Sequence, residues 1–202
     1  MNRLTLNIRS AFVGNLPLEL NVKVDLSPGI TQVCGANGSG KTTFLSALAG
    51  ARDFNGSVQM DGIDLHEQPN QYKRRVGYCP HAYEFVEHIS PCQYLGFVAQ
   101  CFNYNFADGF GEMYSEIGFQ WRRGQLIRHL SYGNKKKLLL LASILAKPDL
   151  WILDEPTNGL DARAANWLEN RLKSFENDHC ILIACHDAQW LEKFQYSSIQ
   201  IG

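Results

Sequence analysis

The 202-residue sequence contains no uninterrupted apolar stretch of about 18 residues, the length that a membrane-spanning helix needs. The opening residues, MNRLTLNIRS, alternate polar and apolar side chains and lack the apolar centre of a secretory signal peptide. We therefore expect nothing in this chain to span a bilayer, and a soluble, cytosolic protein whose cysteines are reduced.

Metal-binding cysteine spacing is also missing. The six cysteines form no C-x-x-C pair, and Cys34, Cys79 and Cys185 lie in apolar runs where cysteine acts as a small hydrophobic residue. Charge is nearly balanced, with 19 Lys and Arg against 20 Asp and Glu. This balance gives no broadly basic surface, so we expect no nucleic-acid partner. A hydrophobic content of 45% suits one core and a single domain.

A glycine-rich loop occupies residues 35–42, GANGSGKT, and fits the pattern G-x-x-x-x-G-K-[ST]. In such a loop, backbone N–H groups surround a polyphosphate, the lysine reaches the β and γ phosphates, and the following hydroxyl binds Mg²⁺. Residues 30–34 predict a buried strand before the loop, and residues 42–49 predict a helix behind it that ends at Gly50. The anion would then lie at a helix N-terminus, where the helix dipole favours it.

Periodicity and turn residues predict alternating strands and helices along the rest of the chain. Ser90, Pro91 and Gln93 form a capping-box signature that starts a helix reaching about residue 104. The further expected strands are 3–9, 18–26, 56–60, 75–79, 150–153, 180–185 and 197–201, and the further expected helices are 108–117, 131–146, 161–175 and 187–194.

Two adjacent acids, Asp154 and Glu155, follow the apolar strand at 150–153. In open α/β sheets, ligands gather at the carboxyl ends of the strands. Burying ionised carboxylates is costly unless a cation or hydrogen bonds compensate them, and Mg²⁺ with a water nucleophile would do so. His186 ends the strand at 180–185, either as a surface residue or within reach of the same phosphate.

Three consecutive lysines, Lys135 to Lys137, come near the start of the helix that Ser131 caps. Cations at the positive end of a helix cost roughly 0.3–1 kcal/mol each. They form either a solvated basic face or a helix end that faces an anion such as a γ-phosphate. Phe12 likewise has two interpretations, packing in the core or stacking on a nucleobase.

The order of these motifs resembles the ATP-binding cassette (ABC) family of transporter ATPases over essentially the whole chain. Residues 35–42 look like the family's Walker A motif, and residues 150–155 look like Walker B. The sequence LSYGN at 130–134 resembles the family's signature motif, although Tyr132 replaces a glycine and Asn134 a glutamine of the usual LSGGQ. Leu160 and Asp161 fall where the D-loop lies, and His186 falls where the switch histidine lies.

The resemblance implies an α/β, P-loop NTPase fold: a mainly parallel sheet flanked by helices, with an N-terminal antiparallel β subdomain and a helical subdomain. Residues 1–202 would form a single ABC ATPase domain. Within it, residues 1–81 and 131–202 would be the β/α catalytic core, and residues from about 82 to 130 the helical subdomain.

The resemblance also assigns roles to individual residues, with ATP and Mg²⁺ as cofactors. Glu155 would be the general base, and His186 would orient the γ-phosphate. Thr42 and Asp154 would hold Mg²⁺. His81 stands where the family usually has a metal-contacting glutamine that links the nucleotide to the membrane partner, and imidazole is a poor Mg²⁺ ligand. The expected nucleotide contacts are Gly35, Ala36, Asn37, Gly38, Ser39, Gly40, Lys41, Thr42, Thr43, Phe12, Ser131 and Gly133.

The family places the signature serine of one subunit across the nucleotide from the phosphate loop of another. We therefore expect a head-to-tail homodimer that sandwiches two ATP molecules, or a heterodimer with a relative. A membrane permease on a separate chain would dock on the helical subdomain near Tyr83, Phe85, Tyr94 and Phe97, although packing in the core is the alternative for each of these aromatics. This docking would place the protein peripherally on the inner face of the cell membrane. The permease would set the substrate and the direction of transport.

The run LWILDEP and the small size resemble ATPase subunits of small exporters, including the haem exporter of cytochrome c assembly. The alternative is a soluble family member that works in DNA repair, translation or cluster assembly. A second alternative is a module that uses ATP only to dimerise, and intact Glu155 and His186 argue against it.

Overall fold

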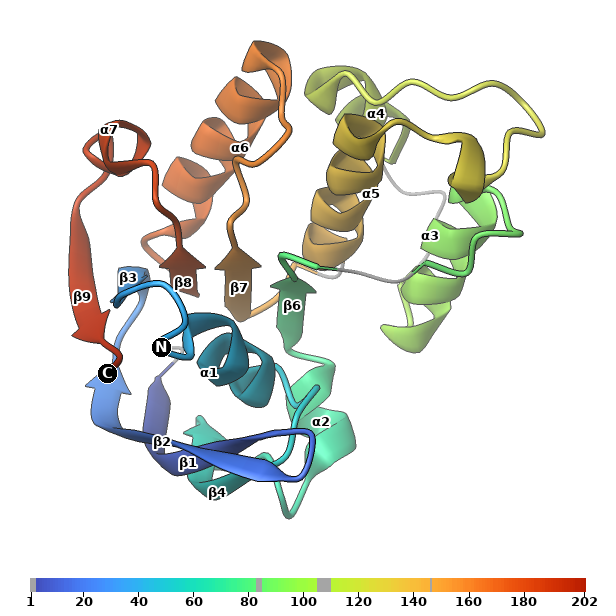
Figure 1. Ribbon diagram of the computed structural model, residues 1–202. Coiled ribbons are helices and arrows are strands. Elements are labelled where there is room, and N and C mark those ends of the chain that lie inside the picture. Colours follow the sequence, from blue (N-terminus) through green and yellow to red (C-terminus); the bar gives the residue numbers. More distant parts are fainter. Residues whose placement is uncertain (1–2, 83–84, 105–109, 146) are drawn as a thin grey trace.

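A computed structural model describes residues 3–82, 85–104, 110–145 and 147–202 of the chain. The strands form two sheets (Figure 1). The antiparallel sheet has the order β2-β1-β4-β5, with bounds Leu16–Leu26, Leu4–Val13, Phe54–Met60 and Ile63–Asp64. The parallel sheet has the order β6-β7-β8-β3-β9, with bounds Val76–Cys79, Leu150–Asp154, Cys180–Ala184, Gly29–Cys34 and Tyr196–Gln200.

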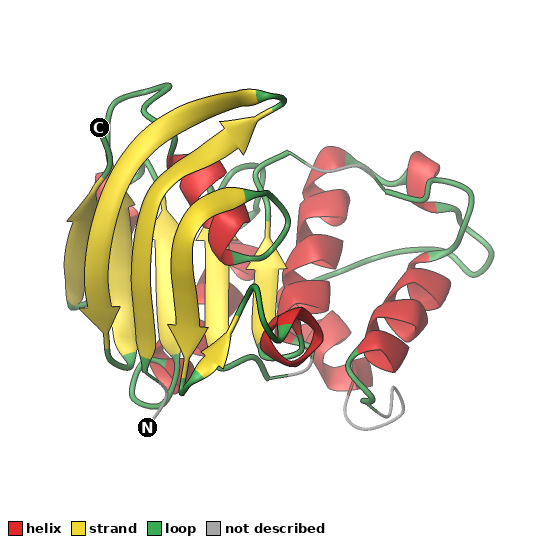
Figure 2. Cartoon of the chain, turned by 90° about the horizontal axis from the view of Figure 1, so that it is seen from below, coloured by secondary structure: helices red, strands yellow, loops and turns green. Residues whose placement is uncertain are grey.

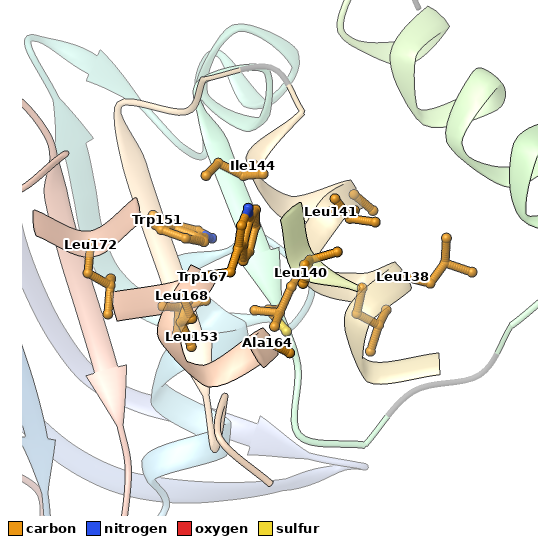
Figure 3. Packing of buried hydrophobic residues seen from close by; sticks show 14 of the residues in the cluster. Leu138, Leu140, Leu141, Ile144, Trp151, Leu153, Ala164, Trp167, Leu168 and Leu172 are labelled. Carbon is orange, nitrogen blue, oxygen red and sulfur yellow. The ribbon is translucent and has the colours of Figure 1, made fainter. Parts of the chain in front are cut away.

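The two central strands of the parallel sheet, β7 and β8, are buried at every position. One face, which includes Trp151 and Leu153, packs against α5 (Tyr132–Ile144) and α6 (Ala162–Phe175), as Figure 3 shows. The other face, which includes Leu150 and Ile152, packs toward α1 (Lys41–Leu48) and the antiparallel sheet. Burial on both faces explains why these strands read as continuous apolar runs.

Helix α5 approaches the parallel sheet closely. A Cβ atom on Gly77 of β6 would overlap the carbonyl oxygen of Ser143, so only glycine fits there. The indole Nε1 of Trp151 also donates a 2.9 Å hydrogen bond to Ser143 Oγ, which satisfies a polar atom inside the core. These contacts fix the position of α5 against β6 and β7.

The long antiparallel strands curve across the near side of the molecule in Figure 2. Within β1, the pairing register shifts between Ile8 and Ser10, which is a β-bulge. Residues 4, 6 and 8 face the core before the bulge, and Ala11 faces it afterwards. The expected strand at 3–9 is therefore too short, because the bulge interrupts the alternation from which the strand was predicted.

The remaining helices cover the edges of the molecule. They are α2 (Pro69–Lys73), α3 (Pro91–Cys101), α4 (Phe110–Ile117), the 3₁₀ turn η1 (Ile127–His129) and α7 (Ala188–Leu191). The capping box predicted for α3 is confirmed, because Ser90 Oγ accepts from the Gln93 amide and Gln93 Oε1 accepts from the Ser90 amide. Residues 108, 109 and 146, the ends of two expected helices, lie outside the described residues.

The mainly parallel sheet with an antiparallel β subdomain, expected from the sequence, is confirmed. Among the described residues, no helix combines the length and the hydrophobicity needed to cross a membrane.

Candidate functional site

The glycine-rich loop connects β3 to α1. Gly40 is the N-cap of α1 with φ of 102°, a left-handed conformation that favours glycine. The first turn of α1 contains no acidic residue, and no side chain caps it. The positive end of the helix dipole is therefore not neutralised within the chain, which suits an anion.

Lys41 folds back over this loop. Its Nζ donates hydrogen bonds to the carbonyl oxygens of Gly35 at 2.8 Å and Ala36 at 3.0 Å. Both partners are neutral carbonyl groups, so a negatively charged phosphate would attract the ammonium more strongly.

The acid pair lies at the carboxyl end of β7. Asp154 is 2% exposed, and the described part of the chain gives its Oδ2 no hydrogen-bond partner. Glu155 is 9% exposed and has a positive φ of 47°, a strained conformation for a residue other than glycine. Its amide donates a 2.8 Å bond to the carbonyl of Ala184. Buried, incompletely satisfied carboxylates are the arrangement that a bound cation would stabilise.

His186 follows β8 and approaches Glu155. The distance from His186 Nε2 to Glu155 Oε1 is 3.4 Å, and the His186 amide lies 3.4 Å from Glu155 Oε2. The imidazole is 59% exposed, so it points toward open space beside the carboxylate. The pair can therefore orient a water molecule or a phosphate oxygen between them.

One cavity of about 540 Å³ brings most of the expected residues together. Its lining includes the predicted residues Asn37, Gly38, Gly40, Lys41, Thr42, Thr43, His81, Asp154, Glu155 and His186. Val13, Leu18 and Asn158 also line it and were not predicted. The phosphate loop, the acid pair and both histidines thus converge on one space from four different strand ends.

Gly35, Ala36 and Ser39 belong to the same loop but are not among the lining residues. A Cβ atom on Gly35 would lie 2.5 Å from the carbonyl oxygen of Ile201, so the loop packs tightly on the segment after β9. These residues therefore contribute to the shape of the loop without lining the cavity.

Phe12 is not among the residues that line the cavity, and its stacking on a nucleobase stays a prediction. Leu18 pairs with Ala11 across the hairpin, and Val13 follows Ala11 at a spacing of two, so these residues share a face. Because of the β-bulge after Ile8, the odd-numbered residues Ala11 and Val13 of β1 lie on the side of the phosphate loop. The apolar part of the cavity lining therefore includes Val13 and Leu18, which were not predicted.

Ser131 and Gly133 lie away from the cavity, at the start of α5. Ser131 Oγ accepts a 3.2 Å hydrogen bond from the Asn134 amide and caps the helix. A Cβ atom on Gly133 would lie 2.8 Å from the carbonyl oxygen of Gly159. The ring of Tyr132 occupies the position that a Cβ atom of Gly159 would need. The first turn of α5 therefore packs against the loop that follows Glu155.

The expectation of a solvated basic face on α5 is wrong for Lys136 and Lys137, which are 0% and 5% exposed. Lys136 donates to the carbonyl oxygens of Pro80 and Asp154. Lys137 donates to Gly118 O at 2.9 Å and to Asp161 Oδ2 at 2.7 Å, and this hydrogen bond, with the lysine's charge, holds the pKa of Asp161 below its usual value. The carbonyl and carboxylate partners compensate the charges that burial would otherwise penalise.

A larger cavity of about 750 Å³ opens between α4 and α6, and Arg163, Trp167 and Arg171 are among its lining residues. None of the predicted site residues lines it. The candidate site is therefore placed by the convergence of chemical groups and not by cavity size.

Comparison with known proteins gives a consistent result. The sequence pattern of the ABC transporter family matches residues 20–158. The chain is 32% identical to the cytochrome c biogenesis ATP-binding export protein CcmA of Methylococcus capsulatus over 87% of this chain and 86% of that protein. It is 27% identical to the ABC-type transporter ATP-binding protein EcsA of Bacillus subtilis, over 88% of this chain and 74% of that protein. It spans only 9% of the rat phospholipid-transporting ATPase ABCA3.

Solved structures share the fold. One described as the ATP-binding subunit of an ABC transporter has a TM-score of 0.84 and 23% identity, and the match covers 98% of this chain and 85% of that one. The dimeric structure of MJ0796, described as a bacterial ABC transporter cassette, has a TM-score of 0.78 and 16% identity, with 100% and 95% covered.

Proposed function

The chain belongs to the ABC transporter family, and from that premise we propose that it is an ATP-binding subunit that hydrolyses ATP to drive transport through a separate membrane permease. The observation that carries this proposal is the convergence of Lys41, Asp154, Glu155 and His186 on one cavity. A phosphate-binding loop beside a buried acid pair is the arrangement that phosphoryl transfer to water requires.

In the proposed reaction, Lys41 leaves the carbonyl oxygens of Gly35 and Ala36 and binds the β and γ phosphates. Backbone N–H groups of residues 35–43 surround the same phosphates at the positive end of α1. Val13 and Leu18 form the apolar wall nearest the loop and are better placed than Phe12 to contact the rest of the nucleotide.

The residues present fit a magnesium ion. Asp154 Oδ2 is buried without a hydrogen-bond partner among the described residues, and Thr42 lines the same cavity with a hydroxyl group. Oxygen ligands of this kind are those that Mg²⁺ prefers. A bound Mg²⁺ would neutralise charge on the phosphate oxygens. His81 also lines the cavity, and we propose that its weakly coordinating imidazole serves mainly to link the site to the permease.

Glu155 accepts a proton from the attacking water as the general base in this proposal. Its fixed backbone and its burial hold the carboxylate toward the cavity. His186, 3.4 Å from that carboxylate, orients the γ-phosphate and stabilises the charge that develops on it.

We also propose that one copy is half of an active site. Ser131 and Gly133 lie outside the cavity of their own chain, which supports a head-to-tail homodimer, or a heterodimer with a relative, in which the first turn of α5 faces the neighbour's ATP. Residues 1–81 and 131–202 would act as the catalytic core of a single domain.

Residues 82–130 would receive the permease, at the inner face of the cell membrane. Phe97 on α3 is 63% exposed, whereas the Phe85 and Tyr94 rings contact each other and pack against the core. Tyr83 lies outside the described residues. Among Phe85, Tyr94 and Phe97, the three expected docking residues that the structure describes, Phe97 is the most available to a partner.

A Glu155→Gln variant tests this function. We expect turnover to fall by at least about 100-fold, because the amide cannot accept the proton from water. ATP should still bind, and the ATP-bound dimer should accumulate in gel filtration because hydrolysis no longer releases it. Hydrolysis at the wild-type rate would refute the assigned base. Co-purification of a membrane protein with the wild-type chain would distinguish a transporter subunit from a soluble family member.

A further inference from the structure

Lys136 of α5 is a fully buried lysine that the reaction above does not use. The side chain is 0% exposed and ranks among the largest fully buried side chains of the described residues. Its Nζ donates to the carbonyl oxygen of Asp154 at 3.2 Å and to that of Pro80 at 3.3 Å. Burying an ammonium group costs free energy, and a methionine would fill similar space without that cost. The presence of a lysine here therefore suggests that its two hydrogen bonds to carbonyl oxygens have a role of their own.

The two carbonyl groups lie at the ends of neighbouring strands. The ladder between β6 and β7 ends where Cys79 pairs with Leu153, so the next residues, Pro80 and Asp154, lie beyond the last pair of that ladder. The Lys136 ammonium joins the ends of β6 and β7 at that point through these two hydrogen bonds, just after the backbone pairing between the two strands stops. Burial raises the pKa of the neighbouring Cys79 thiol, and the Lys136 charge partly opposes this effect.

Each bridged carbonyl belongs to the peptide that precedes a residue of the cavity. Pro80 precedes His81, and Asp154 precedes Glu155, and both His81 and Glu155 line the cavity. The peptide between Asp154 and Glu155 is held at both ends, since its N–H group donates to Ala184 O at 2.8 Å. Glu155 itself has the strained φ of 47°, a conformation that persists only where the surroundings fix it.

We infer that Lys136 is a positioning residue: its buried ammonium fixes the peptides before Glu155 and His81 and so sets the direction of both side chains into the cavity. In this role the lysine acts through the two backbone carbonyl groups that it binds. The kinetic part of this inference rests on the proposed ATP hydrolysis.

The test compares two buried lysines of α5, Lys136 and Lys137, with one exposed lysine of β2, each replaced by methionine. Lys136→Met should lower kcat by about tenfold or more, since small misplacements of a reacting group have effects of this size, while affinity for a fluorescent ATP analogue stays within about threefold. Lys23→Met, which changes an exposed lysine on β2 far from the site in the sequence and absent from the cavity lining, should change neither quantity. Lys137→Met removes a lysine that is also buried, at 5% exposed, and should lower the thermal midpoint by an amount similar to that of Lys136→Met.

Hydrogen–deuterium exchange supplies a readout that does not depend on activity. The Glu155 amide should exchange about tenfold faster in Lys136→Met, because the peptide is then held at one end only, and at the wild-type rate in Lys137→Met. Wild-type kcat in Lys136→Met, or equal acceleration of exchange in both variants, would overturn the inference.

A second variant covers the case in which Lys136→Met does not fold. Lys136→Gln keeps N–H donors on a shorter side chain that cannot reach both carbonyls, so kcat should still fall at least about fivefold. Wild-type kcat in that variant would overturn the inference. If the wild-type chain itself hydrolyses no ATP, the proposed function fails, and the exchange measurement still decides the role of Lys136.

Discussion

The expected ATP contacts form two sets, one in the cavity and one in the first turn of α5, and the side chains of the two sets are arranged differently. In the cavity, the functional groups face one another: Glu155 lies 3.4 Å from His186, and Lys41 is bound to two carbonyls of its own loop. At the first turn of α5, Ser131 and Tyr132 are exposed, and Gly133 packs on the Gly159 carbonyl.

This difference indicates which part of the site a single chain can complete. In the cavity, the phosphate loop, the acids and the histidines of one chain converge without a contribution from a second copy. The first turn of α5 contains Ser131 and no acidic residue. This turn does not line the cavity of its own chain. We therefore expect substitutions in the cavity to weaken nucleotide binding. Substitutions in the first turn of α5 should affect only the steps that need a second copy.

The largest effect should follow from Lys41→Ala in the cavity. Hydrogen bonds from the ammonium to charged phosphates contribute about 3 kcal/mol, so ATP affinity should fall by about 100-fold. Isothermal titration calorimetry with ATP measures this loss. Lys23→Ala, which removes an exposed lysine from β2, is the matched control and should bind as the wild type does. Unchanged affinity in Lys41→Ala would remove the cavity from the proposed binding site.

A smaller and more selective effect should follow from Ser131→Asp. Aspartate caps a helix as well as serine does, so α5 should be preserved, but its charge would repel a phosphate brought by a neighbouring copy. Turnover should fall about tenfold or more while the affinity of the dilute chain for ATP stays within about threefold. Ser131→Asn caps the helix without charge and should retain most turnover. Loss of ATP affinity in the dilute Ser131→Asp chain would contradict the comparison.

Local sequence signals predicted the parts of the site that depend on neighbouring residues. The capping box at Ser90 and Gln93 and the Ser131 N-cap of α5 involve contacts across three residues, and the structure has both. The acid pair was predicted at a strand end because buried parallel strands have a recognisable composition, and it lies at the end of β7.

Tertiary contacts account for what the sequence did not reveal. The bulge in β1 exchanges the faces of Phe12 and Val13, and a register shift leaves no reliable mark in the amino-acid sequence. Lys136 and Lys137 look like a charged surface, yet carbonyl groups from distant segments at Pro80 and Gly118 surround them. Asn158 was missed because only the folded loop after Glu155 brings it to the cavity.

The central claim, that each site combines the cavity of one copy with the α5 turn of another, is tested most directly by mixing two chains whose separate ATP hydrolysis is strongly reduced. Lys41→Ala keeps an intact turn, and Ser131→Asp keeps an intact cavity. A mixed dimer would contain one complete site, so an equal mixture should recover about a quarter of wild-type ATP hydrolysis. A mixture no more active than its separate components would contradict the account.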